Sequence, residues 1–275
     1  MATRPTTGLV GGWSPYLLCQ GPIRHPGTFD VDLLFSEGAT SGALESVITA
    51  LLAAGFLPSA KHHFQLLRLL KVRDYDVIFN VDLLHPTQPR EPGSLKEPRI
   101  RPEMFVDHVE LAFPISDWLR KNFHGVSIAA PHSGFIFKES AHEQFPLETV
   151  LPSGQTCVVN VPLMNEVALL VTKSESIASP KRPRDSFDVY LTIRQCRDRE
   201  RLVVDLDRLR RRDVVVFNSL LGIRNFVKKD PPTFGHSVET YLPVEQRNPE
   251  LSYLSPRRDP YAEEVLALLD EVGAP

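Results

Sequence analysis

Two aspartates separated by one residue lie in an apolar run near the start of the chain, in the segment TFDVDLLF at 28–35. This segment predicts a strand over 29–35. Alternate side chains of a strand share a face, so Asp30 and Asp32 project together and the apolar residues project to the other side. Neighbouring carboxylates repel each other unless a cation lies between them, and oxygen ligands suit Mg²⁺, which also binds substrate phosphates. The pair therefore predicts a magnesium site, against the alternative of a solvent-facing strand end with two unpaired acids.

Two other segments supply groups that phosphate chemistry needs. Upstream, Gly11, Gly12 and Ser14 belong to the sequence Gly-Gly-Trp-Ser. Glycines let the backbone approach a ligand closely, and a helix that begins there offers amide groups to a phosphate. Downstream, Asp82 supplies a further acid near the end of a predicted strand. These positions favour a phosphate group as the ligand.

Hydrophobic periodicity predicts the elements that carry these residues. A helix is expected from Ser41, a candidate N-cap, to the stop signal at Gly55. A tight connection at Arg73–Asp74 joins two predicted strands at 64–72 and 75–84. The proline-rich segment 85–102 predicts an exposed loop. The other expected strands are 126–138 and 156–161, and the other expected helices are 164–176, 186–196, 213–227 and 261–272.

This order of elements predicts an α/β (α+β) protein. Residues 1–160 are expected to form a mixed sheet with flanking helices, and residues 161–275 a mainly helical domain. Hydrophobic residues make up 42% and charged residues 24% of the 275 residues, which is ordinary for a soluble globular protein. No apolar run approaches the about eighteen residues that a membrane span needs, and the first residues are polar, so a cytoplasmic protein without a membrane partner is predicted.

Cysteine content and charge narrow the classes of site. Cys19, Cys157 and Cys196 are odd in number and widely separated, which indicates neither a disulfide framework nor a zinc site. A net charge of -3 argues against a basic surface over the whole protein. It leaves room for a local basic patch, so an RNA partner stays compatible with the sequence.

The order Gly-Gly-x-Ser, Asp-x-Asp on a strand, a helix, and a later strand with a third acid resembles the polymerase-beta-like nucleotidyltransferase superfamily. The resemblance implies that Asp30 and Asp32 bind metal. It also implies that Gly11, Gly12 and Ser14 bind the triphosphate of a nucleotide. A third carboxylate in such proteins activates the attacking hydroxyl.

Asp82 is the preferred third carboxylate, because its Val-Asp-Leu-Leu setting resembles the usual apolar-Asp-Leu-Leu setting of the family. Asp74 and Asp76 lie in or beside the same predicted hairpin and remain alternatives. Asp76 shares a strand face with Asp82, so an error of register would exchange their roles.

A second group of motifs is similar to the later motifs of AbiEii-type toxins, a family within that superfamily. These motifs are Pro-Leu-Met-Asn-Glu at 162–166, Lys173, and Lys-Arg-Pro-Arg-Asp-Ser-Phe-Asp-Val-Tyr at 181–190. The resemblance implies that Lys173 binds the nucleotide phosphates and that Asp185 lines or orders the site. The residues alone fit equally a solvated lysine and a helix cap at Asp185 beside Arg184. The resemblance covers most of Leu9–Tyr190, and the chain beyond Arg201 matches no motif.

The resemblance implies a metal-dependent nucleotidyltransferase that uses two Mg²⁺ ions and moves an NMP from an NTP to a hydroxyl acceptor. Similarity to the toxins implies RNA, such as a tRNA end, as acceptor and a cognate antitoxin as partner. One alternative is a small-molecule nucleotidyltransferase of the aminoglycoside type. Another is a non-catalytic relative that binds a nucleotide or a partner protein, which the repelling acids disfavour because binding alone does not need them.

Overall fold

The computed structural model describes residues 7–36, 39, 41–59, 62, 64–86, 128–130, 133–138, 141–151, 153–247 and 259–274. Contacts divide the chain into two compact units. The first contains the described parts of Met1–Val10, Thr28–Phe137 and Gln144–Pro162. The second contains Gly11–Gly27 and the described parts of Lys138–Glu143 and Leu163–Pro275. The units interleave along the chain, whereas the predicted domains are two continuous segments, 1–160 and 161–275.

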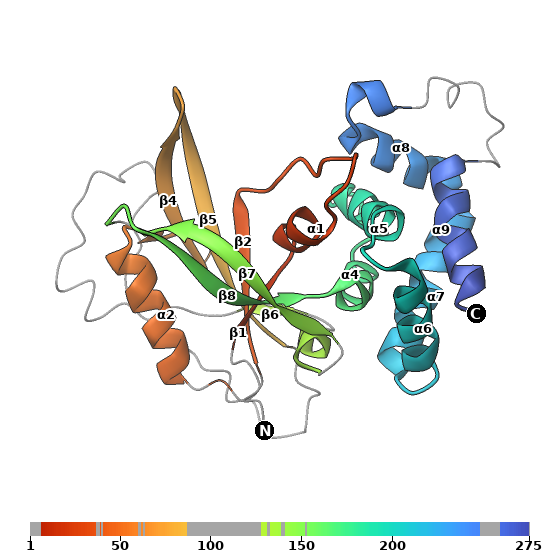
Figure 1. Ribbon diagram of the computed structural model, residues 1–275, viewed down its shortest axis with the longest axis horizontal. Helices are drawn as coiled ribbons and strands as arrows, with labels where there is room; N and C mark the ends of the chain where they lie inside the picture. Colours follow the sequence, from red (N-terminus) through yellow and green to blue (C-terminus); the bar gives the residue numbers. More distant parts are fainter. Residues whose placement is uncertain are drawn as a thin grey trace. The chain divides into compact units, whose positions relative to one another are not determined.

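The first unit is built on a mixed sheet of eight strands among the described residues (Figure 1). The strands are β1 (Thr7–Val10), β2 (Asp30–Phe35), β3 (Leu57–Pro58), β4 (Gln65–Val72), β5 (Tyr75–Pro86), β6 (Ile128–Ala130), β7 (His142–Val150) and β8 (Thr156–Met164). Their order across the sheet is β3-β4-β5-β2-β1-β8-β7, and β6 pairs with β5 outside this path. β2 runs antiparallel to β1 and parallel to β5. The predicted α/β class with a mixed sheet is therefore confirmed.

One face of the central strands forms a hydrophobic core with α2 (Ser41–Ala53). The core residues of the strands alternate along the chain, as the sheet geometry requires. Those of the helix recur at three- and four-residue spacing. The buried members are Phe35, Leu44, Ile48, Leu52, Leu66, Val81 and Leu83, with Val31, Leu33, Val47, Leu51 and Phe56 packed against them. The even-numbered residues of β2 and β5 are left for the opposite face.

Two backbone features fix the ends of these elements. After α2, Gly55 adopts a φ of 84°, its N–H bonds to Leu52 and the Phe56 N–H bonds to Leu51. This paired arrangement is a Schellman motif, which needs a residue in the left-handed region. Between β4 and β5 a two-residue turn contains Arg73 with a φ of 56° and pairs Val72 with Tyr75. The predicted helix stop and tight connection are both observed.

Other predicted boundaries differ from the structure. β5 extends to Pro86, two residues into the predicted loop, and 87–102 lies outside the described residues. Within the predicted strand 126–138, the described residues form the short strand β6 and a 3₁₀ helix, η2 (Ser133–Phe137). β7 lies at one end of the strand order and was not predicted.

The second unit is helical. Its described helices are α1 (Trp13–Leu18), α4 (Glu166–Lys173), α5 (Arg184–Arg194), α6 (Arg199–Arg210), α7 (Val214–Lys229), α8 (Pro231–Tyr241), α9 (Pro260–Glu271) and the 3₁₀ helix η3 (Val244–Gln246). Side chains cap the first turns of five of them: Asn165, Asp198, Asp213, Asp230 and Asp259 accept hydrogen bonds from backbone N–H groups. Such caps satisfy amides that the helix itself leaves without partners. The predicted helical C-terminal part is confirmed.

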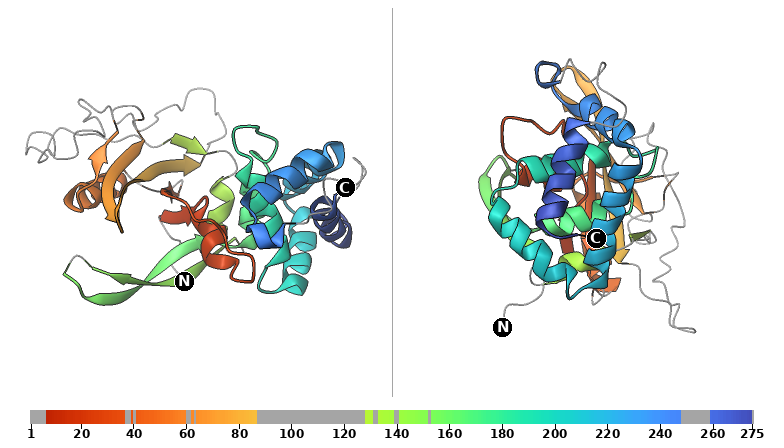
Figure 2. Two further views of the ribbon diagram at one scale, coloured as in Figure 1. Left: turned by 90° about the horizontal axis from the view of Figure 1, so that it is seen from above. Right: turned by 90° about the vertical axis from the view of Figure 1, so that its right-hand side faces the viewer.

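α5 is the central helix of this unit and contacts α1, α4, α8 and α9 (Figure 2). Every residue from Asp185 to Ile193 is buried, so the helix has no solvent-facing side. Its polar side chains therefore need partners within the protein. No helix in the described part of the chain is both long and apolar enough to cross a membrane.

Candidate functional site

The predicted metal ligands lie on one face of neighbouring strands in the first unit. β2 and β5 pair in a register that sets Asp32 beside Asp82 and Asp30 beside Asn80. Register partners project to the same side of a sheet, on strands about 4.8 Å apart. Asp30 is exposed, and Asp32 and Asp82 are partly exposed. We call this set of three acids the acid face; it lies opposite the core that α2 covers.

Two amides hold one oxygen of Asp82. Gln65 Nε2 donates to Asp82 Oδ1 at 2.8 Å, and Asn80 Nδ2 donates to the same oxygen at 3.1 Å. Gln65 reaches it because β4 pairs with β5 in a register that sets Gln65 opposite Asp82. Asn80 reaches it because residues two apart on a strand share a face. Asp82 Oδ2 receives no hydrogen bond from the described residues.

The acid face fits magnesium in the type of its donors, since all three are carboxylates and Mg²⁺ prefers oxygen. It also fits in backbone placement, because the three positions are adjacent on one face. The side chains themselves do not converge on one point. Among the described residues, no group of three or more His, Cys, Asp or Glu side chains could hold a metal ion as it stands. Binding would therefore require side-chain rotation on a fixed strand register.

The alternative third acids lie elsewhere on the hairpin. Asp74 is in the turn, and Asp76 pairs with Lys71 next to the turn. β2 pairs with β5 only over Asn80–Leu84, and Asp76 lies outside that range. A strand rises about 3.3 Å per residue, so Asp76 is roughly 20 Å along β5 from Asp82. Asp82 is thus the member of the three that neighbours Asp32.

The predicted phosphate-binding residues belong to the second unit. Gly11 has a φ of 72° and accepts a hydrogen bond from the Ser14 N–H at 3.3 Å. Gly12 is the N-cap of α1, with no side-chain capping bond. Ser14 is fully buried, and its Oγ has no hydrogen-bond partner among the described residues. The Ser14 hydroxyl is therefore buried in this conformation.

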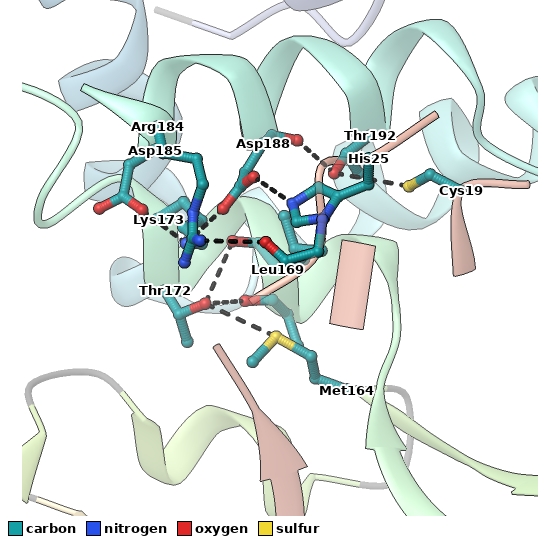
Figure 3. Close-up of polar contacts among 12 residues, drawn as sticks. Cys19, His25, Met164, Leu169, Thr172, Lys173, Arg184, Asp185, Asp188 and Thr192 are labelled. Atoms are coloured by element: carbon teal, nitrogen blue, oxygen red, sulfur yellow. Dashed lines mark hydrogen bonds and ion pairs between the residues drawn. The ribbon is translucent and has the colours of Figure 1, made fainter. Parts of the chain in front are cut away.

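Lys173 and Asp185 lie together in a buried ionic cluster of the second unit (Figure 3). Lys173 Nζ is 2.5 Å from Asp185 Oδ1 and 2.6 Å from Asp188 Oδ2. The second contact is an ion pair rather than an aligned hydrogen bond. His25 Nε2 is 3.0 Å from Asp188 Oδ1 on the side away from Lys173. We call these four residues the Lys173 cluster; it ties the loop before β2 to α4 and α5.

The hydrogen bonds define the protonation of the cluster. The Gly27 N–H donates to His25 Nδ1, so that nitrogen carries no proton and Nε2 donates to Asp188. Burial alone would raise the pKa of Asp188, but the Lys173 ammonium and the His25 N–H outweigh it and hold that pKa below its ordinary value. Burial alone would lower the pKa of Lys173, but Asp188 and Asp185 outweigh it and raise that pKa. Lys173 is therefore charged, and two carboxylates share it.

One acceptor in the cluster lacks a donor. Asp185 Oδ2 is buried and has no hydrogen-bond partner among the described residues. Asp185 is only 3% exposed, so this oxygen is shielded from bulk solvent. Buried polar atoms without a partner are uncommon in folded proteins, and a bound ligand is one way to satisfy them.

The loop that carries His25 is fixed to α5 by a second contact. Gln195 Oε1 accepts from the Ile23 N–H at 2.7 Å, and Gln195 Nε2 donates to the carbonyls of Cys19 and Ile23. A side chain at Gly21 would collide with Gln195, since an added Cβ would lie 2.5 Å from its amide oxygen. The glycine is thus needed for close approach.

Sequence reasoning gave no site role to four residues that touch the predicted ones: Gln65, Asn80, Asp188 and His25. Three of them carried a signal. Asn80 is two residues before Asp82 on a strand, and Asp188 is one helical turn after Asp185, so each shares a face with a candidate. The two-residue turn at Arg73–Asp74 also fixes Gln65 opposite Asp82. His25 carried no local signal, because its partner is 163 residues away.

Comparison of the chain with protein-family models, with curated proteins and with solved structures finds no match in any of the three.

Proposed function

We propose that this protein is a magnesium-dependent nucleotidyltransferase. It would move an NMP from an NTP to a hydroxyl acceptor and release pyrophosphate. The observation that carries the proposal is the acid face, where Asp32 and Asp82 are register neighbours and Asp30, two residues before Asp32, lies on the same face of β2. All three positions supply carboxylate oxygens on one face of the sheet, and oxygen donors suit Mg²⁺, which supports metal binding there.

In this proposal Asp30 and Asp32 hold the metal ions, and Asp82 completes the set and receives the proton of the acceptor hydroxyl. Bound Mg²⁺ supplies charge neutralisation for the triphosphate and for the attacking and leaving oxygens. The protein's own contribution is to position these groups, because phosphoryl-type transfer depends mainly on positioning and electrostatics. The strand register provides that positioning.

The resemblance extends the proposal to Lys173 and Asp185. Lys173 would contact a nucleotide phosphate only by exchanging one of its two carboxylate partners for a phosphate oxygen. The donor-free Asp185 Oδ2 supports a role in accepting a hydrogen bond from a ligand. RNA such as a tRNA end as acceptor, and a cognate antitoxin as partner, are proposed on the resemblance to AbiEii-type toxins alone.

The test is transfer of label from each alpha-labelled NTP in turn to total tRNA in the presence of Mg²⁺. Asp30→Asn and Asp32→Asn should abolish labelling. The matched control is Asp76→Asn, which removes an exposed acid from β5 outside the register shared with β2. Label that moves equally with wild-type protein and Asp30→Asn would refute the proposal.

A non-catalytic nucleotide-binding or partner-binding protein is the second candidate. Two observations favour it: the acid side chains do not converge among the described residues, and the Lys173 charge is already shared by two carboxylates. The same assay separates the candidates when calorimetry is added. Nucleotide binding without transfer to RNA or to an aminoglycoside would favour the non-catalytic candidate.

A further inference from the structure

Asp82 is a partly exposed carboxylate that is held through one of its two oxygens. Both of its hydrogen bonds in the described structure go to one oxygen, Oδ1, and both donors are side-chain amides. An ionised carboxylate only accepts, so Gln65 and Asn80 must present their NH₂ groups to it. Oδ1 is thereby occupied, and Oδ2 stays open.

The two amides come from two directions that the sheet fixes. Gln65 is on β4 directly across from Asp82, and Asn80 is on β5 two residues before it. Asn80 is also only 9% exposed, which limits the side-chain rotations open to it. Donors on both strands therefore restrict rotation of the Asp82 carboxylate about its own side-chain bonds.

Asp82 also neighbours β2, the strand that carries the proposed metal-binding pair Asp30 and Asp32. Asp32 is its register partner on β2, so the open oxygen has an acid as a lateral neighbour. In metal sites, a carboxylate that binds the metal through one oxygen commonly accepts hydrogen bonds from protein groups as well. We propose that Gln65 and Asn80 are positioning residues, which fix Asp82 through Oδ1 and offer Oδ2 to a divalent cation.

This inference rests on the proposed function, since it concerns the same metal site. Loss of such a hydrogen-bonding partner typically weakens metal affinity about tenfold to a hundredfold. Gln65→Met and Asn80→Leu keep side-chain size and remove the donors. The matched control is Gln144→Met, which changes an exposed glutamine on β7 of the same sheet.

The experiment is titration of the full chain with Mn²⁺, followed by the electron paramagnetic resonance signal of the free ion. Gln65→Met and Asn80→Leu should each weaken Mn²⁺ binding about tenfold or more. Gln144→Met should bind as wild type does. In an Asp82→Asn background, adding Gln65→Met should cause no further loss, because the group that it positions is already gone.

The outcomes separate this inference from the proposed function. If wild type binds Mn²⁺ and Asp82→Asn weakens it, but Gln65→Met and Asn80→Leu bind normally, the positioning role is wrong and the metal site stands. If Gln65→Met still weakens binding in the Asp82→Asn background, the amide acts on the general structure instead. Absence of Mn²⁺ binding by wild type would overturn both the inference and the proposed function.

Discussion

Replacing Lys173 by methionine removes the ammonium from between two buried carboxylates. Lys173, Asp185 and Asp188 are each less than a tenth exposed, so solvent cannot screen the change. Removing one partner of a buried ion pair costs about 3–5 kcal/mol, because it leaves an uncompensated charge. At about 2–4 °C per kcal/mol, the melting temperature should fall by on the order of 10 °C.

The loss should depend on pH in a defined direction. In wild type the pKa of Asp188 is lower in the folded than in the unfolded protein. Its ionic contacts therefore stabilise the fold above the ordinary carboxyl pKa of about 3.9. This stabilisation is lost as the pH falls through the pKa of the folded state. In Lys173→Met only the His25 N–H still opposes burial, so the pKa of Asp188 should rise relative to wild type. Protonation then relieves the buried charge, so the deficit relative to wild type should shrink from neutral pH towards about pH 4.

The assay is urea unfolding of wild type, Lys173→Met and the control Lys181→Met, followed by circular dichroism at several pH values. Lys181 is exposed in the segment before α5, so its replacement should change the free energy of unfolding very little. Equal stability of Lys173→Met and Lys181→Met, or a deficit that does not shrink at low pH, would refute the charge assignment.

Three further results are expected. Gly235→Ala should destabilise the protein by about 1 kcal/mol or more, because an added Cβ would lie 1.6 Å from Asp259 Oδ2. Gly222→Ala in α7 should stabilise it by about 1 kcal/mol, because the added Cβ meets nothing within 4 Å. Thermal melting compares the two variants, and equal shifts in melting temperature would contradict the packing. Gly55→Ala should cost about 1–2 kcal/mol in urea unfolding, because its φ of 84° disfavours a side chain, and no loss would argue against the helix stop. Burial raises the pKa of the Cys19 thiol to about 12, so peptide mapping should find it alkylated by iodoacetamide only after unfolding, and labelling of the native protein would contradict its burial.

The local sequence pattern was sufficient to predict the strands, helix and turn around the acid face. β2 shows alternating acids and apolar residues, α2 has an apolar stripe ended by Gly55, and the step Arg73–Asp74 leaves room only for a tight turn. Each of these signals acts within a few residues, where backbone geometry and burial agree. The placement of Asp32 beside Asp82 needed the parallel pairing of β2 and β5, which local pattern does not determine.

The missed elements have weak or misleading local signals. β7 contains Pro146, which suits an edge strand but lowers the expectation of any strand. α6 has only Leu202 and Leu206 buried, so charged residues obscure its apolar stripe. α8 begins with two prolines, which favour a helix start but discourage a helix in a pattern search. Tertiary packing supplies what these sequences lack.

Four arginines, Arg208 and Arg210–Arg212, form a basic run at the C-terminal end of α6, and the structure decides how this charge pattern is interpreted. Arg208 pairs with Asp205, while Arg210 and Arg211 pair with Asp207. These exposed pairs at helical spacing contribute little stability, yet they satisfy most of the local positive charge. The run therefore gives no support to an RNA contact at this helix end.

The most direct test of the acid face as a catalytic centre is the rate of nucleotide transfer by Asp82→Asn, measured beside Asp76→Asn under the same conditions. Loss of Asp82 should slow transfer roughly 10³-fold, which corresponds to about 4 kcal/mol of lost charge stabilisation and positioning. Asp76→Asn should keep the wild-type rate, because Asp76 lies outside the register that β5 shares with β2. Transfer by Asp82→Asn at the wild-type rate, or a loss confined to Asp76→Asn, would contradict the assignment of the acid face.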